Sequence, residues 1–322
     1  MSSKTYKAVL VGCGVIGAGH DEYSHAAAYT QHPNMDLVAC VDPNAQNVSA
    51  CCEKWNLLAG YASLEDAIAD GIEADVISIA TPKAFHEEAL RQGVELHPKA
   101  VICEKPFTGG LVQAQAILAL YGDKGISLAV NYHRCWDPTL IKLRDDLASG
   151  VWGNVQSIHG GYCKGLYQNG SHIINLLEFL LGSLELVAVT DMKPGFEDDD
   201  TFGFVLKTSQ GAMAYIGGLA TNPYFFHELT IYCEKGAIAI EDAGQTVRLR
   251  LVDDDPLFPG ERHLSRGAFQ ETENTASFYN AIDNVFNHLE SGAHLNCTGE
   301  DGAKVIQLCE MIRFMSDGGG DA

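Results

Sequence analysis

The stretch that decides the fold reads Lys7-Ala8-Val9-Leu10-Val11-Gly12-Cys13-Gly14-Val15-Ile16-Gly17. It joins a short apolar strand to a Gly-x-Gly-x-x-Gly loop. The glycines permit a tight turn and a close approach of backbone N–H groups to a pyrophosphate, and the N-terminus of the following helix favours negative charge. The loop alone is a weak signal, but here a strand precedes it, a helix follows it and an acidic residue ends the next strand. We therefore expect a dinucleotide-binding loop made by Gly12, Gly14, Val15, Ile16 and Gly17.

The acidic residue is Asp42, which follows the apolar run Ala39-Cys40-Val41. It lies 25 positions after Gly17, whereas about 20 is usual. The excess indicates a short insertion, most simply residues 20–24 before the helix begins. A carboxylate here can accept both ribose hydroxyls and would repel a 2′-phosphate, so Asp42 favours NAD over NADP.

The first 130 residues alternate apolar strands with helical stretches. The expected strands are residues 7–11, 37–41, 76–80, 100–103 and 127–130, and the expected helices are residues 25–32, 45–55, 64–70, 86–92 and 111–121. Strands that alternate with helices indicate βαβ units, and continuously apolar strands fit a parallel sheet covered on both faces. We expect residues 1–130 to form an NAD-binding Rossmann domain with a doubly wound parallel sheet.

The pattern changes after Asn131, where strands follow one another with few helices between them. The expected strands are residues 155–162, 186–190, 201–207, 212–218, 228–233, 237–241 and 246–252, and the expected helices are 138–149, 172–181, 273–290 and 300–315. Residues 253–267 read as a polar loop. This pattern predicts a second, α+β domain over residues 131–322 with a mainly antiparallel sheet.

Composition narrows the classes of partner. Lys and Arg number 21 against 42 Asp and Glu, a formal net charge of −21. Such a surface repels nucleic acid and anionic membranes, because binding phosphates requires clustered cations. The most apolar stretch, residues 173–189, contains Glu178 and Glu185 and is wrong for a membrane span. We expect neither a nucleic-acid nor a membrane partner.

The ten cysteines are scattered and form no Cys-x-x-Cys pair. Cys40, Cys103 and Cys233 sit inside strand-like runs, and no secretory signal pattern opens the chain. We therefore expect buried thiols in a reducing, cytoplasmic compartment. The acidic runs 198–200 and 253–255 are expected to be solvated turns, and we expect no metal site.

Two further motifs follow expected strands. Glu104-Lys105-Pro106 follows residues 101–103, and Thr81-Pro82, with His86 shortly after, ends the preceding strand. The carboxyl ends of parallel strands are where such sheets bind ligands. Taken alone, the tripeptide indicates a salt bridge at the end of a strand, with Lys105 a structural partner of Glu104.

With these motifs together, the chain resembles the Gfo/Idh/MocA family, named after glucose–fructose oxidoreductase and inositol dehydrogenase. The resemblance covers nearly the whole chain and includes His25, Asn131-Tyr132-His133-Arg134 with Pro138, and Gly170-Ser171-His172. It implies a Rossmann domain followed by a substrate-binding and oligomerisation domain on a large open sheet. It also implies oxidation or reduction of a secondary alcohol on a sugar, cyclitol or nucleotide sugar, by a homodimer or homotetramer.

The resemblance assigns roles to individual residues. It places Thr81, Pro82, Glu104 and Lys105 at the cofactor and puts Lys105 beside the reacting hydroxyl. The second motif of the family commonly reads Asp-x-x-x-His, which here becomes Gln168-Asn169-Gly170-Ser171-His172. A neutral amide cannot take a proton as a carboxylate does. The acid–base work then falls to His172, Lys105, or a substitute such as Tyr167 or Lys164.

The residues themselves support His172. Asn169 is a plausible N-cap that would put His172 in a first helical turn, where the positive helix end lowers the imidazole pKa and suits a general base. Tyr167, Gln168 and Asn169 are then substrate contacts. Lys164 and Arg134 could anchor a phosphate or carboxylate, or be solvated surface charges.

The sequence thus indicates an NAD-dependent oxidoreductase in which Lys105 and His172 are catalytic. Two alternatives remain open at this point. One is an enzyme that oxidises a sugar transiently with bound NAD so that a glycosidic bond can be eliminated. The other is a non-catalytic, NAD-binding regulatory protein, for which the altered position Gln168 gives some support.

Overall fold

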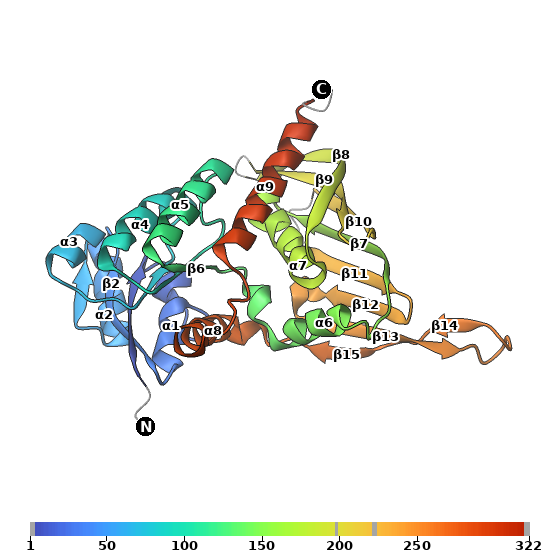
Figure 1. Cartoon of the computed structure of the whole chain (residues 1–322), viewed down its shortest axis with the longest axis horizontal. Coiled ribbons are helices and arrows are strands. Elements are labelled where there is room, and N and C mark those ends of the chain that lie inside the picture. Colours follow the sequence, from blue (N-terminus) through green and yellow to red (C-terminus); the bar gives the residue numbers. More distant parts are fainter. Residues whose placement is uncertain (1–3, 197–198, 221–223, 319–322) are drawn as a thin grey trace. The chain divides into compact units, whose positions relative to one another are not determined.

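The computed structural model describes residues 4–196, 199–220 and 224–318 (Figure 1). The chain divides into two compact units. The first contains residues 1–136 and 275–304, and the second contains residues 137–274 and 305–322.

The first unit is built on a six-stranded parallel sheet in the order β3-β2-β1-β4-β5-β6. Its strands are β1 (Tyr6–Val11), β2 (Met35–Val41), β3 (Ala59–Tyr61), β4 (Val76–Ile79), β5 (Ala100–Cys103) and β6 (Ser127–Val130). The chain order reverses between β1 and β4, so their carboxyl ends flank the crevice where doubly wound sheets bind ligands. The expected strands and the parallel, doubly wound sheet are confirmed.

Helices accompany this sheet. They are α1 (His25–Gln31), α2 (Ala45–Trp55), α3 (Leu64–Ala69), α4 (His86–Gly93), α5 (Leu111–Lys124) and, from late in the chain, α8 (Ser277–Ser291). Helix α8 packs against α1, with Phe278 and Val285 buried. Strand β3 was not expected, because three residues around Gly60 carry no apolar run.

The second unit contains a nine-stranded sheet in the order β14-β13-β12-β11-β7-β10-β9-β8, with β15 also paired to β13. Its strands are β7 (Val155–Cys163), β8 (Leu184–Phe196), β9 (Asp199–Thr208), β10 (Met213–Leu219), β11 (His227–Cys233), β12 (Gly236–Glu241), β13 (Thr246–Asp254), β14 (Arg262–Leu264) and β15 (Ala268–Glu271). Among the described strands of this second sheet, only β7 and β10 pair in parallel, so the mainly antiparallel sheet is confirmed.

Burial alternates along this sheet, which therefore has one packed and one exposed face. In β10, Ala214 and Ile216 are buried whereas Tyr215 is 46% exposed. Helices α6 (Pro138–Ala148) and α7 (Ser171–Leu181) contact each other, and α9 (Gly299–Ser316) closes the chain.

Residues 253–267 are not one loop. Strand β13 continues to Asp254, and β14 pairs back onto it. Main-chain hydrogen bonds form this hairpin without an apolar signal, which is why the polar sequence read as a loop.

The described cysteines are all free thiols, of which Cys40 and Cys103 are buried and Cys233 is half-buried. Among the described helices, none combines the length and the apolar character that crossing a membrane requires.

Candidate active site and cofactor cleft

Close packing requires glycine at two positions of the loop after β1. Gly12 has a φ of +97°, and a Cβ there would lie 2.6 Å from the carbonyl of Ala80. A Cβ on Gly17 would lie 1.9 Å from the Gly12 carbonyl oxygen. A Cβ on Gly14 would meet nothing within 4 Å. The first and third glycines therefore allow the turn to close, and the second leaves open backbone for a ligand to approach.

A five-residue π-helical turn, Val15–Gly19, follows this loop instead of a regular helix. Helix α1 begins only at His25, where the Ser24 hydroxyl accepts a hydrogen bond from the Ala27 N–H. The expected helix start at residue 25, after an insertion of residues 20–24, is therefore confirmed. The N–H groups of Ala18 and Gly19 both bond to the Gly14 carbonyl, which closes the turn.

Residues 20–24, the expected insertion, are fastened to neighbouring elements. Lys54 in α2 donates to the Gly19 carbonyl at 2.7 Å and pairs with Asp21 at 2.6 Å. The ring of Tyr23 packs edge-on against Phe278 at 4.6 Å. Burial raises the pKa of Tyr23, and Glu104 raises it further.

Asp42 is 8% exposed and firmly oriented at the end of β2. One carboxylate oxygen accepts the Cys13 N–H at 2.9 Å. The other accepts the Asn44 N–H at 2.9 Å and the Asn47 amide at 3.2 Å. Each carboxylate oxygen accepts about two hydrogen bonds, so acceptor capacity remains for a ribose.

A cleft of about 690 Å³ opens between the glycine loop and the ends of β2 and β4. It is lined by Val11, Gly12, Gly14, Val15, Ile16, Val41, Asp42, Pro43, Asn47, Ala62, Ser63, Leu64, Glu65, Ala80, Thr81, Pro82, Phe85, Glu88, Ala89 and Gln92. The buried Thr81 hydroxyl has no hydrogen-bond partner among the described residues, so it can form a hydrogen bond with a ligand in the cleft. None of these lining residues is Lys or Arg. The residues present fit NAD, and a 2′-phosphate would find no cation here.

Glu104, at the end of β5, lies at the centre of a hydrogen-bonded chain. Its Oε1 is 3.1 Å from His25 Nε2 and accepts from the Asn131 amide at 2.7 Å. The chain continues from His25 Nδ1 to the Ser78 hydroxyl at 3.1 Å and on to the Tyr29 hydroxyl at 2.8 Å. Burial alone would raise the pKa of Glu104, but the hydrogen bonds from His25 and Asn131 and the charge of Lys105 lower it.

Lys105 and Arg134 place positive charge around His133. Burial, then Arg134, then Lys105 hold the pKa of His133 well below its usual range, so this imidazole is neutral near pH 7. Arg134 is 5% exposed, and burial lowers its pKa to about 10. The alternative that Arg134 is a solvated surface charge is therefore wrong, because the turn His133–Trp136 packs against α8.

His86, at the start of α4, connects two strand ends. Nε2 lies 2.7 Å from the Thr81 carbonyl oxygen, and Nδ1 lies 2.7 Å from the Pro106 carbonyl oxygen. The loops after β4 and β5 are thereby held by one buried ring.

In the second unit, the π-helical turn Leu166–Gly170 runs directly into α7. Asn169 is not an N-cap, because its amide donates to the Cys163 carbonyl at 2.9 Å. The cap comes from a distant strand: the Asp199 carboxylate accepts the N–H groups of Tyr167 at 3.1 Å and Gln168 at 2.8 Å. Asp199 is therefore not part of a solvated turn, whereas Asp198 lies outside the described residues. Sequence reasoning missed Asp199 because only the fold brings it to this turn.

The remaining site residues of this unit come from the same segment. His172 is 8% exposed, and its ring meets that of His227 in β11 at 6.4 Å. Lys164 Nζ lies 5.8 Å from the ring centre of Phe225. Burial raises the pKa of Tyr167, while Gln168 is exposed. His227 was missed, since a lone histidine in a strand carries no signal.

Comparisons with known proteins agree with this architecture. The family described as "Oxidoreductase family, NAD-binding Rossmann fold" matches residues 11–132, and its companion "GFO/IDH/MocA C-terminal domain" matches residues 160–239. An inositol 2-dehydrogenase of Rhizobium meliloti (strain 1021) is 26% identical over 94% of this chain and 96% of its own length.

Solved structures share the fold at lower identity. An oxidoreductase from Agrobacterium radiobacter in complex with NAD+, L-tartaric acid and magnesium superposes with a TM-score of 0.79 at 19% identity, over 98% of this chain and 97% of that one. The WlbA dehydrogenase from Bordetella pertussis in complex with NADH and UDP-GlcNAcA gives 0.79 at 20% identity, over 99% and 97%. The chain belongs to the Gfo/Idh/MocA family and is an oxidoreductase with an NAD-binding Rossmann fold.

Proposed function

We propose that this protein transfers a hydride between NAD and a secondary alcohol of a sugar, cyclitol or sugar-nucleotide substrate. The observation that carries the proposal is the cleft at the glycine loop, with Asp42 at its ribose end and no cation among its lining residues. Relatives named for inositol oxidation and a fold neighbour bound to NADH and a nucleotide sugar support the substrate class.

The protein holds the cofactor through backbone and carboxylate groups. Gly12 and Gly17 keep the loop closed. Val15 and Ile16 line the cleft. Asp42 accepts ribose hydroxyls. When bound, NAD supplies the hydride acceptor, and the protein supplies orientation and electrostatics. NAD should bind more tightly than NADP, and calorimetry with both cofactors tests this.

Lys105 and His172 carry the proton chemistry in this proposal. Lys105 follows Glu104, whose ionised carboxylate is held by His25 and Asn131. As a cation, Lys105 stabilises the negative charge that develops on the substrate oxygen. His172 takes the hydroxyl proton as a general base.

Substrate recognition is assigned to the segment that carries His172. Lys164, Tyr167, Gln168, Asn169 and Arg134 are the proposed substrate contacts. The amide donor of Asn169 already bonds to Cys163, so its free amide oxygen is the group offered to substrate.

We also propose that the protein is a homodimer or homotetramer formed through the open sheet face. Large apolar side chains on that sheet support this: Val187, Tyr215 and Tyr232 are 45%, 46% and 39% exposed. Light scattering at micromolar concentration tests the proposal, which a monomeric mass would contradict.

The decisive experiment screens sugars, cyclitols and sugar nucleotides for NAD reduction and then repeats the assay with variants. Lys105→Ala should lower kcat by about 10²-fold or more, the scale of a lost acid–base or electrostatic group. NAD affinity should change much less. Lys99→Ala is the matched control, because Lys99 precedes the same strand and pairs with Asp75.

Two results would count against the proposal. Near-normal turnover in Lys105→Ala would overturn the assignment of the catalytic lysine. Substrate conversion without accumulation of NADH would instead indicate transient oxidation followed by elimination.

A further inference from the structure

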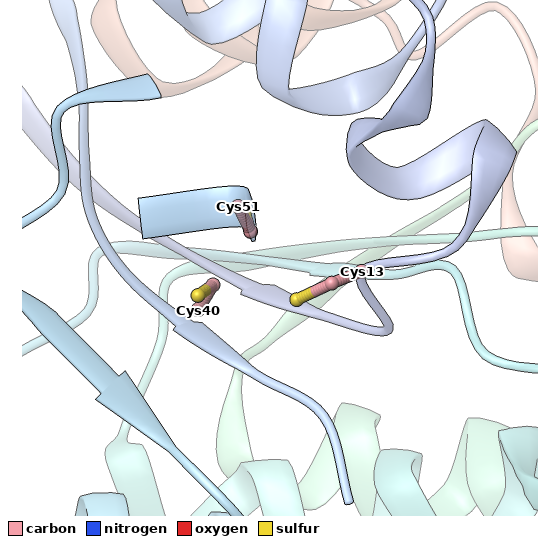
Figure 2. Close-up of side chains that lie close together, drawn as sticks. All are labelled: Cys13, Cys40 and Cys51. Atoms are coloured by element: carbon pink, nitrogen blue, oxygen red, sulfur yellow. The ribbon is translucent and has the colours of Figure 1, made fainter. Parts of the chain in front are cut away.

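Three cysteines from separate elements lie close together (Figure 2). Cys13 lies in the glycine loop, Cys40 in β2 and Cys51 in α2. Their exposed fractions are 8%, 0% and 2%. The three Sγ atoms all lie within 4.8 Å of one another.

This arrangement is close to that of a thiolate metal site. Zn–S bonds of about 2.3 Å in tetrahedral geometry place sulfur atoms about 3.8 Å apart, so only a modest contraction is needed. The three-residue group contains sulfur only, and thiolates select soft or borderline cations. We propose that Cys13, Cys40 and Cys51 bind a thiophilic divalent cation, of which Zn²⁺ is the physiological class and Cd²⁺ the spectroscopic surrogate.

Binding is an exchange of protons for metal. Three S–H bonds break, three metal–sulfur bonds form and three protons leave to solvent, with no change of oxidation state. Three thiolates alone would place uncompensated negative charge beside Asp42, which accepts the Cys13 N–H. The cation neutralises two of these charges, so the site favours metal over free thiolates.

A fourth thiol lies next to this group. Cys52 Sγ is 3.7 Å from Cys40 Sγ but interacts with the Ala59 carbonyl at 3.8 Å. It lies outside the group of three mutually close sulfurs. It is therefore kept unchanged in every variant below.

The position of the site connects it to cofactor binding. Cys13 separates Gly12 from Gly14, and Cys40 lies two residues before Asp42. A bound cation would join the glycine loop, β2 and α2, which together build the ribose end of the cleft. Metal and NAD should then alter each other's affinity by the same factor.

The test is a titration of the reduced, full-length protein with Cd²⁺ under anaerobic conditions, followed by the ultraviolet band of thiolate-to-cadmium charge transfer. We expect saturation at one Cd²⁺ per chain, and displacement of the ion by Zn²⁺. Cys40→Ala and Cys51→Ala should each weaken binding by about 10²-fold or more, because each removes one direct ligand. Cys297→Ala, which removes another fully buried thiol of the same unit, should leave the titration unchanged.

Thermal unfolding establishes that each variant is folded, and Cys51→Ser replaces Cys51→Ala if the latter is not. Absence of the charge-transfer band in the wild type would overturn the proposal. So would equal Cd²⁺ affinity in the wild type, Cys40→Ala and Cys51→Ala. None of these readouts depends on catalytic activity, so the experiment can refute the metal site without refuting the proposed function, and the reverse.

Discussion

Each unit contains a five-residue π-helical turn, and the two turns differ in whether the protein itself supplies an acceptor for their first N–H groups. Val15–Gly19 and Leu166–Gly170 are both five-residue π-helical turns preceded by a glycine, Gly14 and Gly165. In the second turn, the Asp199 carboxylate accepts the N–H groups of the second and third residues. In the first turn, the N–H groups at those positions, Ile16 and Gly17, have no partner among the described residues.

Under the proposed function, this difference separates a structural turn from one that binds the cofactor. Consecutive N–H groups at the start of a helical turn attract an anion. In the second unit the protein supplies that anion itself, which fixes the segment before His172. In the first unit no described residue supplies such an anion to Ile16 and Gly17, and in the proposed function the pyrophosphate of NAD takes that place.

The strongest test of this comparison distinguishes two glycines of the first turn. In Gly17→Ala the Cβ would lie 1.9 Å from the Gly12 carbonyl oxygen, so the loop must move. We expect a loss of about 1–3 kcal/mol in unfolding free energy and weaker NAD binding, because the moved loop no longer presents its N–H groups to the pyrophosphate. Calorimetry and thermal unfolding measure both.

Gly14→Ala is the matched control, because its Cβ meets no protein atom within 4 Å. It should keep wild-type stability and still weaken NAD binding, since the methyl group stands where the pyrophosphate approaches. Loss of stability in Gly14→Ala, or unchanged NAD binding in both variants, would contradict the comparison.

A second, smaller effect is expected when the internal anion is removed. Asp199→Ala removes both carboxylate oxygens that accept hydrogen bonds from the second turn and should cost about 1.5–3 kcal/mol of unfolding free energy, the range for hydrogen bonds to a charged group. Because the turn precedes His172, kcat/KM should fall while NAD affinity stays unchanged. Asp200→Ala is the control, since its carboxylate accepts the Gly195 N–H at 2.9 Å instead. Equal losses in the two variants would remove the special role of Asp199.

Gln168 sharpens the same contrast. Its N–H bonds to Asp199, so Gln168→Asp introduces a second carboxylate close to the first. We expect kcat/KM to fall several-fold, even though this change restores the usual family residue. Asp199→Asn in the same chain should recover part of the loss. Full activity of the single variant would show that the two carboxylates do not repel each other.

The smallest effect concerns pH. The pKa of Glu104 is lowered in the folded state, so its contribution to stability is present above its unfolded pKa of about 4.3. That contribution is lost as the pH falls through the lower, folded value. Urea unfolding from pH 6 to pH 3 should therefore show a shallower acid-side decline for Glu104→Gln than for the wild type. Glu95→Gln, at an exposed site of the same unit, should follow the wild type.

The sequence could predict features that depend on neighbouring residues, but not contacts that only the fold creates. The positions of the glycine loop, of Asp42 and of the buried strands depend on neighbours along the chain, so the local sequence pattern was sufficient to place them. Asp199 accepts a hydrogen bond from Gln168, in the turn before His172, although the two residues are 31 positions apart in the sequence. No local sequence pattern predicts such a contact. The Asn169 cap was predicted from residue type alone and is wrong because Asp199 already binds the first N–H groups.

Local sequence patterns were also insufficient to place elements late in the chain. Helix α8 joins α1 in the first unit although more than a hundred residues of another unit come between them, and its amphipathic pattern does not say which sheet it covers. Strands β14 and β15 are polar and form through main-chain pairing, for which the sequence carries little signal.

The chain of side chains that ends at Glu104 has a consequence for proton order. A carboxylate only accepts, so His25 Nε2 must carry a hydrogen, and in the neutral ring Nδ1 then accepts from Ser78. Ser78 in turn accepts from Tyr29. With the His25 ring neutral, each hydroxyl and ring in this chain therefore has one hydrogen-bond orientation. Its bond dipoles converge on the carboxylate beside Lys105, so the electric field around that lysine is set before any ligand arrives.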